Sequence, residues 1–171
     1  MRRVVLLDTG PLGKIVNPRK SPEVGEWLDR LVDAGEEVLV PEIADYELRR
    51  GLLRLNDLTG VKRLDDLYSV IGYVPITTAA MRRAAELWAG ARQRGYATAP
   101  DPALDADVIL AAQAVTLASG TVIATENVSH RLSGDQRTLE NGGEPPLTSS
   151  VYIFFWLLLA SSSIQSSESL S

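Results

Sequence analysis

The fold of this chain is decided by Val4-Val5-Leu6-Leu7-Asp8-Thr9-Gly10. Four consecutive apolar residues followed at once by a carboxylate and a glycine predict a buried strand that ends at Asp8. Functional sites of parallel sheets form at the carboxyl ends of the strands, so Asp8 is a candidate functional residue. An Asp between a strand and a helix is equally expected as a plain helix cap. Both interpretations of Asp8 are open from this stretch alone.

Further strands and helices are expected to alternate after this first strand. Apolar or β-rich runs predict strands at residues 37–40, 73–76 and 121–125, and Pro75 places the second of these at an edge of the sheet. Helices are expected at 21–35, 42–55, 62–70, 78–95 and 106–118, with a turn at 10–13 opening a short element that ends near residue 17. The last helix is apolar almost all round, which predicts burial between layers. The pattern indicates an α/β domain in three layers, α/β/α, with a central parallel sheet.

Composition removes several classes of function. The chain has 171 residues and no cysteine, which excludes disulfides, zinc-thiolate sites and thiol nucleophiles and makes a reducing cytoplasm the expected location. His130 is the single histidine, so a site with several histidine ligands is excluded. A net charge of −5 argues against coating nucleic acid by bulk electrostatics, although local arginines could still form a basic rim. Oxygen ligands are the metal-binding groups that remain.

The composition changes near residue 138. All 17 Lys and Arg residues lie at or before Arg137, and a ten-residue apolar run at 151–160 is followed by a Ser-rich end. A membrane helix needs about 20 apolar residues, so this run is not predicted to span a membrane. We therefore expect a folded domain at 1–137 and an atypical, poorly ordered C-terminal tail at 138–171. A shifted reading frame near residues 131–137 would account for the change.

Three acidic residues have the setting to act together, although each has a simpler explanation. Glu47 lies at the border of the apolar face of the helix predicted at 42–55, where a surface pair with Arg50 is the alternative. Asp105 is the expected N-cap of the last helix, which leaves Asp107 in the first turn, where the helix dipole favours its charge. Taken singly, none of these acids requires a function.

A parallel sheet that brought the acids together would change this balance. Two unit charges 4 Å apart repel by about 4 kcal/mol at an effective dielectric near 20, so such a cluster is either partly protonated or held by a cation. Without histidine or cysteine partners, the hard cations Mg²⁺ and Mn²⁺ are the expected ligands.

Four segments of the chain, taken in order and with their spacing, carry a resemblance that covers roughly residues 1–131. They are Leu6-Leu7-Asp8-Thr9-Gly10-Pro11-Leu12, Pro41-Glu42-Ile43-Ala44-Asp45-Tyr46-Glu47-Leu48-Arg49-Arg50-Gly51-Leu52, Asp105-Ala106-Asp107-Val108-Ile109-Leu110-Ala111-Ala112-Gln113-Ala114 and Val122-Ile123-Ala124-Thr125-Glu126-Asn127. Together they resemble the PIN domain, especially its VapC-like branch. The resemblance implies a three-layer PIN-like nuclease domain at 1–137 and a metal-dependent ribonuclease, often the toxin of a toxin-antitoxin pair.

The resemblance also implies roles for individual residues. Asp8, Glu47 and Asp107 match the three principal acids of the family, which would act in catalysis and hold one or two Mg²⁺ ions, with Mn²⁺ as the alternative. Thr9 would lie in the outer shell or contact RNA, and Asp105 would be a cap or an outer-shell group.

The fourth corner of the site departs from the family pattern. Asn127 matches a more variable polar position, and His130 stands where a further acid is often found. The departure bears most on the binding of a second ion. Lys14, Arg49 and Arg50 are weaker candidates to guide the RNA backbone.

The implied partners are an RNA substrate, an antitoxin protein and a second copy of the chain in a homodimer, with no membrane. The alternative is a catalytically impaired PIN-like scaffold that acts as a protein-binding module. Phosphoryl transfer to Asp8 is disfavoured, because the haloacid-dehalogenase-like pattern has a second Asp where this chain has Gly10.

Overall fold

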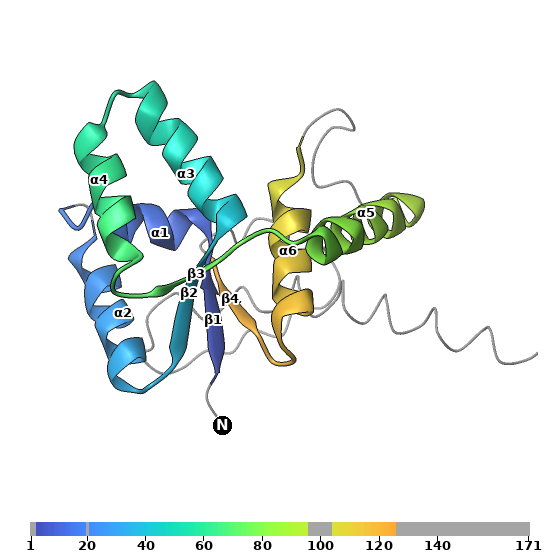
Figure 1. Ribbon diagram of the computed structural model, residues 1–171, viewed down its shortest axis with the longest axis horizontal. Coiled ribbons are helices and arrows are strands. Elements are labelled where there is room, and N and C mark those ends of the chain that lie inside the picture. Colours follow the sequence, from blue (N-terminus) through green and yellow to red (C-terminus); the bar gives the residue numbers. More distant parts are fainter. Residues whose placement is uncertain (1–2, 20, 96–103, 126–171) are drawn as a thin grey trace, which may run out of the picture.

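The sheet of this protein is parallel, as predicted. A computed structural model describes residues 3–19, 21–95 and 104–125 of the chain. Within them the strands lie in the order β3-β2-β1-β4, and every neighbouring pair is parallel (Figure 1). The strands are β1 (Val4–Leu7), β2 (Glu37–Pro41), β3 (Gly72–Val74) and β4 (Val122–Ala124).

Strand β1 divides the interior into two apolar clusters. Successive side chains of a strand point to opposite faces of the sheet, so Val5 and Leu7 enter one cluster and Leu6 enters the other. Leu6 is paired in register with Leu39 of β2 and with Ile123 of β4, which places it at the centre of its face.

Four helices cover the face that carries Val5 and Leu7. They are α1 (Thr9–Val16), α2 (Pro22–Asp33), α3 (Glu42–Arg54) and α4 (Leu58–Leu67). Their buried side chains include Leu12, Leu28 and Leu64, which pack in one cluster with the two strand residues. In Figure 1 these helices lie together on one side of the sheet.

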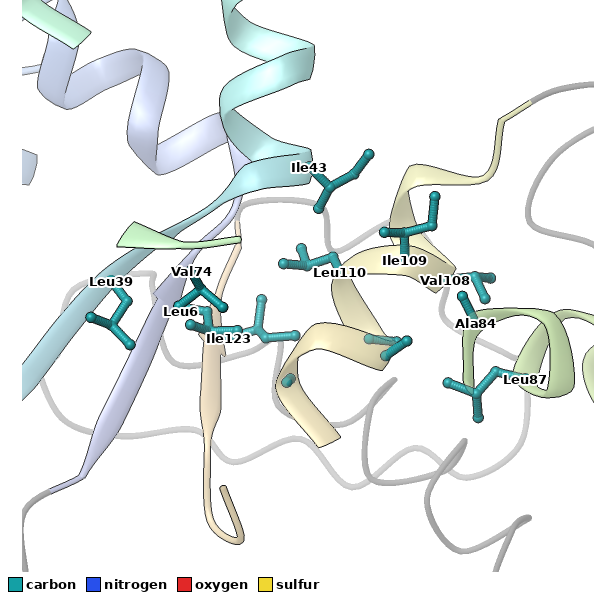
Figure 2. Close-up of a cluster of buried hydrophobic side chains, with 13 residues drawn as sticks. Leu6, Leu39, Ile43, Val74, Ala84, Leu87, Val108, Ile109, Leu110 and Ile123 are labelled. Atoms are coloured by element: carbon teal, nitrogen blue, oxygen red, sulfur yellow. The ribbon is translucent and has the colours of Figure 1, made fainter. Parts of the chain in front are cut away.

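The other face is covered by α6 (Ala106–Leu117), with α5 (Thr78–Gln93) outside it. Every residue from Val108 to Ala114 is buried, so the predicted burial of the last helix is confirmed. Figure 2 shows Leu110 and Ile109 of α6 between the strand residues and the α5 residues Ala84 and Leu87. The three-layer α/β/α arrangement is therefore confirmed.

Two element boundaries differ from the prediction near the start of helices. Helix α1 begins at Thr9 instead of after a turn at 10–13, because Asp8 caps it directly. Helix α4 begins at Leu58 instead of residue 62, because the side chain of Asp57 accepts a hydrogen bond from the Gly60 N–H at 2.8 Å and caps it early.

Strand β3 is an edge strand, as predicted, but it ends at Val74. Pro75 has no N–H to donate. The N–H of Ile76 donates to Oε2 of Glu42 at 2.5 Å, so a side chain takes the place of a strand partner there.

Within the described residues, no helix is long and apolar enough to cross a membrane. The predicted boundary between residues 137 and 138 and the predicted tail lie outside the described part of the chain.

Candidate active site

Asp8 is fixed between the sheet and the first helix. Its backbone N–H donates to the carbonyl of Ala124 in β4 at 2.9 Å, and its carbonyl accepts from the Leu12 N–H at 3.1 Å. Its side chain caps α1, with Oδ1 accepting from the Thr9 N–H at 2.6 Å. The cap interpretation is thus confirmed. A carboxylate has two oxygens and about four acceptor sites, so capping is compatible with a further ligand.

Glu47 is joined to the helix that Asp8 caps. The Thr9 hydroxyl donates to Oε2 of Glu47 at 3.0 Å, across 38 positions of sequence. The other oxygen, Oε1, accepts from Nη2 of Arg50 at 3.2 Å, so the expected surface pair is also present. Thr9 therefore contacts both acids, one through its backbone and one through its hydroxyl. The sequence placed Thr9 in the outer shell but did not predict this bridge.

Asp107 lies at the same edge of the sheet. It is in the first turn of α6, as predicted, and its side chain is exposed. Because α6 runs back toward the start of β4, its N-terminal turn lies at the carboxyl ends of the strands, near the start of α3 (Figure 1). Ile43 of α3 and Ile109 of α6 belong to one apolar cluster, which fixes these two helix starts relative to each other (Figure 2).

Asp105 is the N-cap of α6, as expected. Its Oδ1 accepts from the Val108 N–H at 3.3 Å, and its Oδ2 lies 3.9 Å from Nη1 of Arg92 in α5. The guanidinium of Arg92 also lies over the ring of Trp88, 3.9 Å from its centroid. The cap and the ion pair together attach the start of α6 to α5.

The donor set suits a hard cation, but the three acids do not form a compact group. Asp8, Glu47 and Asp107 offer only carboxylate oxygens, the ligands that Mg²⁺ and Mn²⁺ prefer. Among the described residues, no three His, Asp or Glu side chains are arranged closely enough to hold a metal ion. The structure brings Asp8, Thr9 and Glu47 together and places Asp107 on the same edge.

Comparison with known families assigns the fold. The model of the PIN domain matches residues 5–131. The chain belongs to the PIN domain family. A search of curated proteins finds no match.

Solved structures share this PIN fold. One is VapBC2 from Rickettsia felis, whose structure was solved with a bound promoter DNA fragment. It has a TM-score of 0.61 at 16% sequence identity, and the alignment covers 74% of this chain and 89% of the VapBC2 chain. DNA-bound VapBC from Salmonella typhimurium has a TM-score of 0.55 at 18% sequence identity, and the alignment covers 75% of this chain and 89% of the VapBC chain. FitAcB from Neisseria gonorrhoeae has a TM-score of 0.53 at 25% sequence identity, and the alignment covers 72% of this chain and 88% of the FitAcB chain.

Arg49 of this PIN domain is held in a network instead of pointing freely to the candidate acids. Its guanidinium donates to Asp45 at 2.9 Å, to Asp65 at 2.8 Å and to the hydroxyl of Tyr68 at 3.2 Å. The hydroxyl of Tyr68 in turn donates to Asp45. We call these four residues the Arg49 network. The hydrogen bond to Asp45 contributes most to raising the pKa of Arg49, and the bonds to Asp65 and Tyr68 raise it further. Burial raises the pKa of Tyr68, and its bond to Asp45 adds to this.

The sequence contained one sign of this network. Asp45 and Arg49 are four positions apart on a helix, the spacing of an intrahelical ion pair. Their contacts with Asp65 and Tyr68 depend on how α4 packs on α3, which spacing alone does not specify. Lys14, the other weak candidate to guide RNA, lies in the last turn of α1, and Arg50 lies beside Glu47. Asn127 and His130 lie outside the described residues.

Replacing Asp105 by Ala is expected to lower the free energy of unfolding by about 2–4 kcal/mol, because it removes a helix cap and the carboxylate beside a largely buried Arg92. The side chain of Asp105 is 7% exposed and that of Arg92 is 15% exposed. Chemical denaturation measures the change. Asp107→Ala is the matched control in the same turn, with a smaller expected loss of about 0.3–1 kcal/mol, because Asp107 is exposed and is not the N-cap. Equal losses in the two variants would contradict the structural role of Asp105.

Proposed function

We propose that this PIN domain is a metal-dependent ribonuclease that hydrolyses RNA phosphodiester bonds, as a VapC-like toxin does. The observation that carries the proposal is the bond from the Thr9 hydroxyl to Glu47, which joins two acids from distant parts of the sequence. Both acids lie at the carboxyl edge of a parallel sheet, which is where functional sites of such folds form.

The proposed metal ligands are Asp8, Glu47 and Asp107, with Mg²⁺ as the preferred ion and Mn²⁺ as the alternative. When bound, the ion supplies Lewis-acid chemistry that favours water as a nucleophile at neutral pH and offsets charge on the phosphate. Asp107 would complete the set from the start of α6.

The chain's own residues hold these acids in place. Asp8 is held at the N-terminus of α1, where its Oδ1 accepts from the Thr9 N–H at 2.6 Å. Thr9 orients one oxygen of Glu47, and Arg50 offsets part of its charge through the other. Both carboxylates are therefore held by hydrogen bonds to the same residue, Thr9.

The proposal extends to partners and location. RNA is the substrate, an antitoxin protein is the regulator, and a second copy of the chain forms a homodimer in the cytoplasm. The resemblance to VapC-like proteins supports these assignments, as does the fold shared with VapBC structures.

The first test is metal removal. The purified chain is expected to cleave single-stranded RNA in Mg²⁺, to lose more than about 100-fold in rate with a chelator, and to recover when Mg²⁺ is added back. Mg²⁺ at about ten times its Kd should add about 1.4 kcal/mol to the free energy of unfolding, which raises Tm by roughly 3–5 °C.

The control is sodium chloride at matched ionic strength, which should change neither the rate nor Tm in the same way. A chain that shows neither RNA cleavage nor stabilisation by Mg²⁺ or Mn²⁺ would favour the alternative, an impaired PIN scaffold that binds a protein partner.

A further inference from the structure

Helix α3 carries different groups on two opposite sides. Residues two positions apart on an α-helix are separated by about 200° around its axis. Asp45 and Arg49 each lie two positions from Glu47, so both project from the side of α3 that faces away from it. Glu47 contacts Thr9 at the start of α1, whereas Asp45 and Arg49 contact α4. Helix α3 is thus held from both sides (Figure 1).

On the α4 side, hydrogen bonds within α3 continue into bonds to the end of α4. Arg49 makes bonds to both oxygens of Asp45, through Nε at 3.2 and 3.3 Å and through Nη2 at 2.9 Å. Tyr68, at the C-terminal end of α4, bonds to both of these residues. Its ring also packs edge-on against Tyr73 of β3, with centroids 5.1 Å apart, so the network is anchored to the sheet.

This network differs from an ordinary surface ion pair on α4. Lys62 and Asp66 of α4 lie 2.8 Å apart but are 74% and 62% exposed, and such pairs contribute little to stability. The side chain of Asp45 is only 13% exposed. Arg49 is 29% exposed and Asp65 is 54% exposed, so the network is partly buried around Asp45 and open to solvent at Asp65. Charge-assisted bonds that share partly buried partners restrict geometry more strongly than a solvated pair does.

We propose that the Arg49 network positions Glu47: by fixing the rotation of α3 about its axis, it holds the Glu47 carboxylate against the Thr9 hydroxyl. A small rotation of the helix would be amplified at the end of a Glu side chain, and the 3.0 Å bond to Thr9 would be lost beyond about 3.5 Å. The inference rests on the proposed function of Glu47 as a metal ligand. The residues of the network act through Glu47 and are positioning residues.

A double-mutant cycle between the two sides of α3 tests this coupling without metal or substrate. In the wild-type background, Thr9→Val is expected to lower the folding equilibrium constant about fivefold, because it removes one hydrogen bond. In the Tyr68→Phe background, Thr9→Val should lower the folding equilibrium constant less than about twofold, since Glu47 would already have moved away from Thr9. Chemical denaturation measures both values.

The matched control is Asp66→Asn, which breaks the exposed pair on α4. In the Asp66→Asn background, Thr9→Val should again lower the folding equilibrium constant about fivefold. Equal costs in the Tyr68→Phe and Asp66→Asn backgrounds would overturn the proposal. If Tyr68→Phe does not fold, Arg49→Lys is used instead, because Lys keeps the charge but loses the planar fork that reaches Asp65 and Tyr68.

The metal response provides the second readout. Tyr68→Phe is expected to raise the Mg²⁺ concentration for half-maximal stabilisation and half-maximal cleavage about tenfold, with KM for RNA unchanged and kcat restored by excess Mg²⁺. A midpoint equal to that of Asp66→Asn would mean that the network only stabilises the fold, which overturns the proposal. If the wild-type chain itself neither binds Mg²⁺ nor cleaves RNA, the proposed function fails, and the denaturation cycle still decides the coupling.

Discussion

Asp8→Asn is expected to lower kcat for RNA cleavage by more than about 100-fold and to leave the free energy of unfolding within about 0.5 kcal/mol of the wild type. The two effects separate because Asn is as good an N-cap as Asp, so the bond to the Thr9 N–H at the start of α1 is kept. What is lost is the negative charge. An amide cannot balance a divalent cation as a carboxylate does, and the loss of a direct ligand costs more than the 10- to 100-fold that is typical of its supporting groups.

The measurements are single-turnover cleavage of RNA at saturating Mg²⁺ and chemical denaturation without Mg²⁺. Asp57→Asn is the matched control, since the side chain of Asp57 also caps a helix, α4, and lies outside the proposed site. It should retain both activity and stability. If Asp8→Asn cleaves RNA as fast as Asp57→Asn, Asp8 is a cap and nothing more, and the metal site is wrong.

Leu6→Ala is expected to lower the free energy of unfolding by about 3–5 kcal/mol, the largest stability effect of any single substitution considered. Leu6 is 0% exposed and lies on an inner strand, in one apolar cluster with Ile123 and Leu110 (Figure 2). The cavity would open between the sheet and α6, where neither backbone can collapse easily. The free energy of unfolding of a domain of this kind is about 5–15 kcal/mol in total, so the variant should be close to unfolding at 37 °C.

Urea denaturation gives the change directly. Leu55→Ala removes the same atoms from a side chain that is 72% exposed, and it should cost less than about 0.5 kcal/mol. Comparable losses in the two variants would show that the face of β1 that carries Leu6 is not the tightly packed interior described above.

The elements that the sequence predicted best are those with a continuous apolar run. Strand β1 is apolar throughout and helix α6 is apolar over most of its length, so their burial was predictable from composition. The start of α4 was missed because an Asp cap competes with the apolar period as a boundary signal, and Asp57 determined where the helix begins. The short β3 was overextended by two residues because Ile76 donates to Glu42, a contact between distant segments.

The candidate site was predictable only in part, for a related reason. The resemblance identified Asp8, Glu47 and Asp107, and the end of the first strand identified Asp8 independently as a candidate. The bridge from Thr9 to Glu47 requires that α3 pack against α1 with a particular rotation, and a one-dimensional pattern does not specify rotation. The Arg49 network depends in the same way on the packing of α4 on α3.

The end of β3 limits how the sheet can grow. An edge strand presents unpaired backbone donors that can recruit a strand from another molecule, which is a route to aggregation. Beyond Val74 this edge has no such donor in two successive residues, because Pro75 lacks one and Glu42 occupies that of Ile76. We therefore expect Glu42→Ala to free one donor at this edge and to make the protein more prone to assemble by strand addition.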